Sequence, residues 1–415
     1  MIPPRQHFTA LACLTGMMLS PEALVLHGNL AGMSGLGFVV PMGFVLVVHA
    51  LNAASWQAKA EIGTLRATFG ACGAAWLLLA ARPAVAVCLA TAVLVTAGFV
   101  FNEVFVYWFP NFGFAALLLA TLCLLNLAGP QFASRMQVLF VGTAVLGLMG
   151  LALAGLSAGE AQSTMPRDPA FFKWRAWGLA AIAFVGYDLL RDSAPDLEPA
   201  ARARLTLIGL AAAGLILGAW NTAALLHADP ARLAQTSIPH ILAAKAILGP
   251  AGRVVMGLIA IAGAAAAVNV LFQAVARMTA AMADQDLLPS VFKKPQLPLA
   301  VITGATGLSM AFGFACSNLL DVSLRAGMIL WLTTMGLKRL APLLTGDPKR
   351  RHVFGHLVVL VTMPALAATL WWTDEDPFTL GSTILILAGI AAGLAAAGVF
   401  TARTMARNPV AGIHN

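Results

Sequence analysis

The chain has 415 residues, of which 60% are hydrophobic and 10% are charged, and its mean hydropathy is +0.85. Soluble domains carry about 25% charged residues, so this composition excludes an ordinary soluble domain and indicates a polytopic membrane protein. The net charge of +8 is expected of cytoplasmic loops and does not indicate a nucleic-acid partner. The partners predicted are the lipid bilayer and a small-molecule substrate; the oligomeric state is not indicated.

The first apolar segment covers residues 8–28 and has a proline and a carboxylate at its centre. Pro21 lacks an N–H and clashes with the preceding turn, so it predicts a break in the helix. Glu22 is costly in hydrocarbon and should face protein or water. A broken helix is tolerated at membrane depth only around a cavity, so Ser20, Pro21, Glu22 and Ala23 form the first candidate binding site.

About twelve apolar segments are long enough to span a bilayer. They fall at 8–28, 34–54, 69–101, 112–128, 136–157, 176–192, 204–226, 253–282, 298–317, 322–338, 353–372 and 380–402. We interpret 69–101 as one long helix rather than two short ones split at Arg82-Pro83, because the loop charges then alternate correctly. The predicted fold class is an all-α membrane protein, in which residues 1–415 form a single polytopic domain.

Loop charges indicate the orientation. With the N-terminus inside, most lysines and arginines fall on cytoplasmic loops, including Lys59, Arg135, Lys293 and Lys294, and the acidic loop 374–376 falls outside. This asymmetry predicts cytoplasmic N- and C-termini in the inner (plasma) membrane of the cell. We expect no cleavable signal peptide, since the first span is too long and too internally broken.

The longest predicted outer connection covers about residues 227–252. Its stretch from Ile238 to Leu248 has helical periodicity and is followed by Gly249-Pro250. We expect a lid-like helix that lies over the outer face.

A second break is predicted in the sixth span, where a glycine and a carboxylate again interrupt an apolar run. Its residues are Phe184, Val185, Gly186, Tyr187 and Asp188. Interrupted segments at corresponding places in two five-helix halves point to an inverted-repeat transporter with its site at the midplane. The repeats are predicted at 8–157 and 172–340, followed by two additional helices at 352–402.

Several motifs follow one another in an order and spacing typical of one family. They are Gly16-x-x-Leu19-Ser20-Pro21-Glu22-Ala23-Leu24-x-x-His27-Gly28, Phe69-Gly70, Asn126-Leu-Ala-Gly129, Arg135-x-Gln137, Ala183-Phe184-Val185-Gly186-Tyr187-Asp188, Asn269, Arg277 and Asp286-Leu-Leu-Pro289. With these motifs the chain resembles the amino acid–polyamine–organocation superfamily of secondary transporters.

The resemblance implies a ten-helix core of two inverted repeats (5+5) with helices 1 and 6 broken. It implies a secondary active transporter of amino acids or related small amines that works by alternating access, rocking spans 1, 2, 6 and 7 against the remainder. The substrate would bind at the unwound parts of helices 1 and 6. In that family the free backbone N–H groups of the broken first helix hold the substrate carboxylate.

This chain departs from the family at the first break, where Ser20-Pro21-Glu22 replaces Gly-Ser-Gly. Pro21 removes one donor, and Glu22 places a negative charge where a carboxylate would bind. Both changes favour a substrate that presents an ammonium group. The alternative function is therefore an amine- or polyamine-selective carrier with Glu22 as the ammonium ligand.

Arg82 lies about thirteen residues into the third span, roughly 20 Å from its inner end, and so near mid-membrane. It could pair with Glu22, making both charges tolerable. It could instead hold a substrate carboxylate by a bidentate contact. The third interpretation is that the predicted boundary of this span is misplaced, so that Arg82 does not lie near mid-membrane.

Coupling candidates are Glu22 and Asp188, although Asp188 could equally form a helix-end ion pair with Arg191. His27 and His49 are either proton relays, since imidazole titrates near neutral pH, or hydrogen-bonded structural residues. Phe184 and Tyr187 either pack or stack on the substrate.

In the family that the chain resembles, sodium is held between spans 1 and 8, usually by Ser or Thr hydroxyl groups. The corresponding run 263–267 contains no hydroxyl side chain. A lysine found in some branches aligns with Ala144. The carrier is thus expected to be sodium-independent, either proton-coupled or an exchanger.

No catalytic residue, cofactor or metal site is predicted. The five cysteines lack CxxC spacing and read as small core residues. No protease, hydrolase or nucleotide-binding motif sits in a context that would give it chemistry. A channel, or an intramembrane enzyme with Glu22 and His27 as a catalytic pair, are the remote alternatives.

Overall fold

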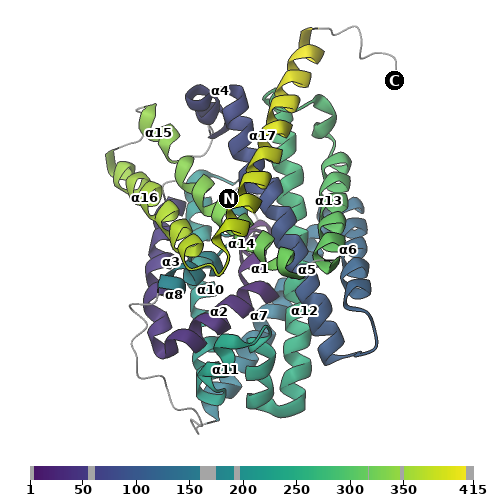
Figure 1. Ribbon diagram of the computed structural model, residues 1–415, viewed down its shortest axis with the longest axis vertical. Coiled ribbons are helices and arrows are strands. Elements are labelled where there is room, and N and C mark those ends of the chain that lie inside the picture. The colour runs from purple at the N-terminus through teal and green to yellow at the C-terminus, as the bar shows by residue number, and fades with distance from the viewer. Residues whose placement is uncertain are drawn as a thin grey trace. The chain divides into compact units, whose positions relative to one another are not determined.

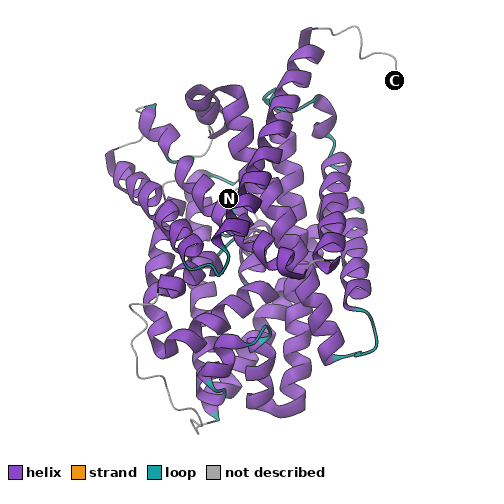
Figure 2. Cartoon of the chain, viewed as in Figure 1, coloured by secondary structure: helices purple, strands orange, loops and turns teal. Residues whose placement is uncertain are grey.

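The structure, a computed structural model, describes residues 4–54, 61–158, 174–190, 197–315, 317–345 and 350–407. These residues are helical and include no strand (Figures 1 and 2). Eight helical stretches in this part of the chain are long and apolar enough to cross a membrane, and two shorter apolar helices accompany them. The predicted all-α membrane fold is confirmed.

Helices in the first half of the chain are mostly separated by short turns. They are α1 (Pro4–Met18), α2 (Pro21–Ser34), the 3₁₀ turn η1 (Gly35–Phe38), α3 (Val39–Ala54), α4 (Glu61–Leu79), the π-helical turn η2 (Ala80–Ala84), α5 (Val85–Val104), α6 (Asn111–Leu127), α7 (Pro130–Ser157) and α8 (Trp174–Ala183).

Helices of the second half include the longest of the described chain. They are α10 (Pro199–His227), α11 (Pro230–Gln235), α12 (Pro239–Asp284), the 3₁₀ turn η4 (Ser290–Lys293), α13 (Gln296–Ala315), α14 (Ser317–Leu337), α15 (Leu340–Leu344), α16 (Arg350–Trp372) and α17 (Pro377–Arg407).

The chain packs as two compact units. One contains Met1–Ala53 and Ala92–Val270, and the other contains Ala54–Thr91 and Leu271–Asn415. Helices α5 and α12 each pass from one unit to the other, so the units are not sequential halves of the chain. The repeats at 8–157 and 172–340 therefore stay a prediction.

In the first unit, α2 packs against α8, α10 and α11, and α1 packs against α7 and α10 (Figure 1). Two glycines of α2 let the α11 region approach closely. A side chain at Gly28 would lie 2.6 Å from Pro239, and one at Gly32 would collide with the backbone of Ala234. The predicted end of the first span at residue 28 is therefore wrong: the helix continues to Ser34, because its glycines serve packing rather than termination.

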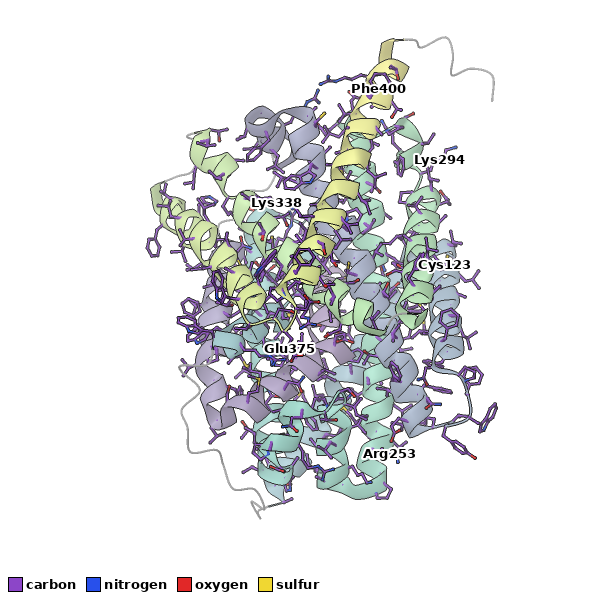
Figure 3. The ribbon with its side chains drawn as sticks, in the orientation of Figure 1. Cys123, Arg253, Lys294, Lys338, Glu375 and Phe400 are labelled. Carbon is purple, nitrogen blue, oxygen red and sulfur yellow. The ribbon has the colours of Figure 1, made fainter. Side chains whose placement is uncertain are left out.

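The predicted helix over residues 238–248 is present as the first part of α12. The backbone leaves helical geometry at Leu248 and Gly249, where Gly249 has φ 61°, and then resumes a helix to Asp284. At the start of this second part, Arg253 pairs with Glu103 at 3.3 Å and ties α12 to the end of α5 (Figure 3). That the first part forms a lid over the outer face stays a prediction.

The third span is one continuous helical stretch over Ile62–Val104, as predicted. It bends at Gly70, which has φ 71° and ψ 177°. Pro83 is accommodated in the π-helical turn η2, since such a turn re-satisfies backbone groups that a proline leaves unpaired. The proline therefore distorts this span without dividing it.

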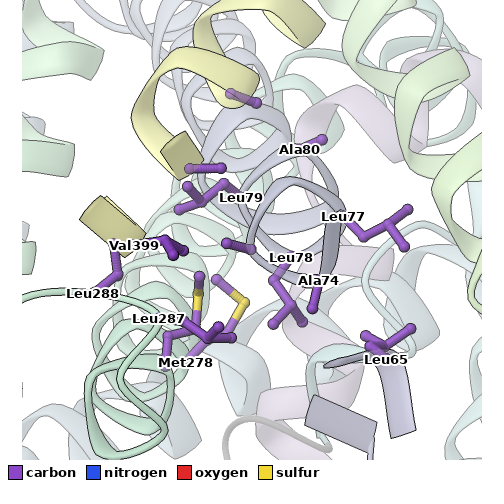
Figure 4. Close-up of a cluster of buried hydrophobic side chains, with 14 of the residues drawn as sticks. Leu65, Ala74, Leu77, Leu78, Leu79, Ala80, Met278, Leu287, Leu288 and Val399 are labelled. Atoms are coloured by element: carbon purple, nitrogen blue, oxygen red, sulfur yellow. The ribbon is translucent and has the colours of Figure 1, made fainter. Parts of the chain in front are cut away.

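The second unit has a core of aliphatic side chains from α4, α12, α14 and α17. Leu77 and Leu78 lie with Met278, Leu287 and Val399 in this cluster (Figure 4). The indole of Trp76 donates to the Ala388 carbonyl at 3.1 Å, which adds a polar tie between α4 and α17.

An ion pair holds the turn between α16 and α17. Arg325 of α14 lies 2.9 Å from Asp374 and 2.8 Å from Asp321, and the Asp374 side chain is only 1% exposed. In the acidic loop 374–376, Asp374 is therefore paired with an arginine of its own unit.

Candidate functional site

The predicted break in the first span is present, between the end of α1 at Met18 and the start of α2 at Pro21. Ser20 is the N-cap of α2, and its hydroxyl accepts the Ala23 N–H at 3.2 Å. The Ser20 carbonyl accepts the Leu24 N–H at 3.0 Å. Since Pro21 has no N–H, much of the donor capacity of this helix N-terminus is absent or used within the chain.

Glu22 lies in the first turn of α2 and is 9% exposed. The Thr96 hydroxyl of α5 donates to Glu22 Oε1. A negative charge in the first helical turn is also stabilised by the helix dipole. The carboxylate is thus held in place by a hydrogen bond and by the helix to which it belongs.

The predicted second break is also present. Helix α8 ends at Ala183, residues 184–188 form a turn, and helical structure resumes at Leu189. Gly186 has φ 94°, a backbone conformation that side chains other than glycine rarely adopt. Phe184, Val185 and Tyr187 are each at most 2% exposed.

Asp188 closes this turn and is 2% exposed. Arg191, its predicted helix-end partner, lies outside the described residues. The two readings of Asp188, coupling group or ion-pair member, therefore both stay predictions.

The two breaks contact each other. A Cβ on Gly186 would lie 2.5 Å from Met17 Cβ and Cγ, in the last turn of α1. From the other side, a Cβ on Gly263 of α12 would collide with the Leu19 carbonyl oxygen and lie 3.5 Å from Ser20 Cα. Only glycine permits these approaches, so the unwound backbone of the first break is enclosed by the second break and by α12.

Polar side chains of α3 surround the second break. His49 is fully buried, its Nε2 lies 3.3 Å from the Ala181 carbonyl, and its ring centroid lies 4.4 Å from that of Tyr187. Asn52, one turn later, donates to the Tyr187 hydroxyl. The second break is therefore attached to α3 at both of its ends.

His27 of α2 is buried on the same side. Its ring meets Phe184 edge-on at 5.4 Å, and its Nδ1 lies 3.4 Å from Asn221 Nδ2 of α10. Its Nε2 has no hydrogen-bond partner among the residues that the structure describes. Both histidines thus lie at the end of α8.

Three amide side chains form a buried network behind α1. Asn126 donates to Asn269 at 2.9 Å, Asn269 donates to Gln137 at 2.7 Å, and Gln137 donates to the Ala12 carbonyl at 3.1 Å. These residues belong to motifs of the family resemblance. The structure adds that they join α6, α12 and α7 to α1.

Arg82 is 7% exposed and lies in η2, in the second compact unit. Its pairing with Glu22, a residue of the first unit, and its alternative contact with a substrate carboxylate both stay predictions. Within the described ranges, no group of three or more His, Cys, Asp or Glu side chains is placed to hold a metal ion.

Sequence reasoning missed Thr96, Asn52 and Asn221. Asn52 carries a usable signal, because it follows His49 by three residues and so shares its helix face. Thr96 carries none, since threonines in apolar helices usually bond to their own helix. Thr15, for example, donates to the Leu11 carbonyl at 2.9 Å.

A polytopic helical membrane protein with two broken helices that meet at buried polar groups has the arrangement of a solute transporter. A family model described as amino acid permease matches residues 8–402. The chain belongs to this family, within the amino acid–polyamine–organocation superfamily, and the predicted resemblance is confirmed. No curated protein matches the chain.

The protein is therefore a transporter rather than an enzyme, a multi-pass membrane protein for amino acids or related compounds.

Proposed function

We propose that the protein is a sodium-independent secondary active transporter of amino acids or related small amines, working by alternating access. The proposal rests mainly on the contact between the two breaks, where Gly186 meets Met17, and on the approach of α12 to the first break, where Gly263 meets the Leu19 carbonyl. Unwound backbone exposes polar groups that a solute can bind, and such groups are tolerated at membrane depth only around a cavity.

The proposed substrate site comprises the residues of both breaks. They are Ser20, Pro21, Glu22, Ala23, Phe184, Val185, Gly186 and Tyr187. Arg82, a residue of the second unit, stays the predicted contact for a substrate carboxylate. Glu22 and Asp188 are the proposed coupling groups, because buried carboxylates are the groups by which membrane carriers relay protons. Exchange of one substrate for another is the other proposed mode.

The second candidate function is transport restricted to amines or polyamines, with Glu22 as the ammonium ligand. It is favoured by the capping at the first break, where Ser20 accepts the Ala23 and Leu24 N–H groups and Pro21 offers none. A substrate carboxylate would meet few donors there and a fixed negative charge. An ammonium group would meet a carboxylate already oriented by Thr96.

Ligand-dependent thermal unfolding of the purified protein tests both candidates, with leucine, ethanolamine and putrescine as probes. A ligand at 100 times its Kd stabilises the folded state by about 2.7 kcal/mol. If ethanolamine or putrescine raises the unfolding temperature of the wild type but not of Glu22→Gln, Glu22 is the ammonium ligand. If leucine stabilises both proteins equally, the amine-selective candidate is wrong.

Glu103→Gln is the matched control, since this glutamate pairs with Arg253 and its side chain is 56% exposed. It should respond to the probes as the wild type does. Uptake into proteoliposomes of the probe that binds best then tests coupling. We expect uptake to be unchanged when potassium replaces sodium, and a requirement for a sodium gradient would refute sodium independence.

A further inference from the structure

The end of α8 at the second break exposes backbone acceptors. A helix leaves its last four carbonyl groups without partners inside the helix, here those of residues 180–183. The Ile182 carbonyl accepts the Val185 N–H at 3.1 Å. The Ala181 carbonyl is reached by His49 Nε2 at 3.3 Å. A histidine from α3 therefore caps the carbonyl end of α8.

The contact with Ala181 defines one proton of His49. A carbonyl only accepts, so the 3.3 Å contact requires a proton on His49 Nε2. His27 lies beside it, with Nδ1 3.4 Å from the Asn221 amide nitrogen.

The surroundings of His49 tie it to the unwound segment at several points. Its ring packs on Tyr187 at 4.4 Å and lies 6.4 Å from Phe184, and it interacts electrostatically with Asp188. Asn52, on the same face of α3, holds the Tyr187 hydroxyl. Displacement of His49 would therefore disturb the whole turn from Phe184 to Asp188.

We propose that His49 is a positioning residue: its Nε2–H caps the end of α8, and its ring holds the unwound segment 184–188 in the shape that the substrate meets. It acts through this backbone rather than by carrying a transported proton. The proposal rests on the proposed function only in placing the substrate at this segment.

Nitrogen-15 NMR of histidine-labelled protein in lipid nanodiscs tests the protonation without any substrate. The His49 signals are identified by their absence in His49→Gln. We expect a ring that carries a proton on Nε2 at pH 7. A neutral ring protonated on Nδ1 alone overturns the proposal.

Transport kinetics test the positioning role with leucine, ethanolamine and putrescine as probes. The glutamine side chain in His49→Gln keeps an N–H donor near the Nε2 position and cannot titrate, so KM and the pH profile should match the wild type. His49→Leu removes the donor and should raise KM about tenfold, the change expected for one lost buried hydrogen bond.

His227 supplies the control pair, because its Nε2 lies 2.7 Å from the Gly155 carbonyl, away from both breaks. His227→Leu and His227→Gln should leave KM unchanged even where His227→Leu lowers the unfolding temperature. The proposal is overturned if His49→Gln abolishes pH-dependent uptake or if His49→Leu and His227→Leu change KM equally. A carrier that transports none of the probes would refute the proposed substrate class, while the NMR result would still decide the proposal.

Discussion

At the scale of single residues, Glu22 shows how a charge is accommodated at membrane depth. Its side chain is 9% exposed, its charge lies in the first turn of α2, and the Thr96 hydroxyl donates to Oε1. Hydrogen bonds to ionised groups contribute about 1.5–3 kcal/mol, more than those between neutral groups. The position of this carboxylate therefore depends on a threonine of another helix.

Thr96→Val keeps the side-chain shape and removes the donor. We expect the KM of the transported substrate to rise roughly tenfold, because the Glu22 carboxylate loses the hydroxyl that donates to its Oε1. Radiolabelled uptake at several substrate concentrations measures this change.

Thr91→Val is the matched control on the same helix. Thr91 is 1% exposed and its hydroxyl has no hydrogen-bond partner among the residues that the structure describes. This substitution should leave KM unchanged and should not lower the unfolding temperature. Equal effects of the two substitutions would mean that Thr96 contributes only to packing.

At the scale of helices, the breaks are defined by glycine as much as by proline. Gly186→Ala imposes a positive φ on a residue with a side chain and brings its Cβ to 2.5 Å from Met17. The left-handed conformation alone costs about 1–2 kcal/mol. We expect a lower unfolding temperature and loss of uptake.

The control for Gly186→Ala is Gly142→Ala in α7, where no atom lies within 4 Å of the added Cβ. Alanine is favoured over glycine inside a helix by about 0.5–1 kcal/mol. This variant should be as stable as the wild type or more so. A fully active Gly186→Ala protein would contradict the close contact of the two breaks.

The amide network makes a separate prediction about α1. Gln137→Leu removes the donor to the Ala12 carbonyl and one of the two acceptors of the Asn269 amide, which keeps the Ala133 carbonyl at 3.2 Å. Helix α1 should then open locally about tenfold more often. The readout is maleimide modification of Cys13, which is 3% exposed and adjacent to Ala12 in the chain.

The experiment uses a protein with Cys13 as its one cysteine. A second protein that retains only Cys88, which is 5% exposed and lies in the other compact unit, is the control. Faster modification of Cys13 with unchanged Cys88 supports the role of Gln137. Unchanged Cys13 would show that α1 is held by apolar packing alone.

The sequence predicted those features that depend on local chemistry. Pro21 lacks an N–H whatever its helix packs against, so the first break could be predicted from the sequence. The second break could be predicted because a glycine and a carboxylate in 184–188 interrupt an apolar run. The end of α2 at Ser34 could not be predicted, because the close approach of the α11 region to Gly28 and Gly32 is not visible in the sequence. Thr96 and Asn221 could not be assigned, since their partners come from distant helices.

At the scale of the whole molecule, the family match defines a transporter, and the loop charges predict its orientation. Most positive charges fall on the loops assigned to the cytoplasm, and the acidic turn between α16 and α17 is predicted to fall outside. This assignment depends on counting the third span once. The continuous helical stretch over Ile62–Val104 supports that count.

The last prediction concerns this orientation. Lys294 and Glu375 are both exposed, and each lies in a connection that joins two helices of the second unit (Figure 3). In a cysteine-free background, Lys294→Cys should react with a membrane-impermeant maleimide only in inside-out vesicles. Glu375→Cys should react only in intact cells or right-side-out vesicles. The odd number of predicted spans between the two positions requires opposite sides, so labelling of both from one side would mean that a span between them does not cross the membrane. Labelling of each from the side opposite to the one expected would keep the fold and reverse the orientation, placing both termini outside.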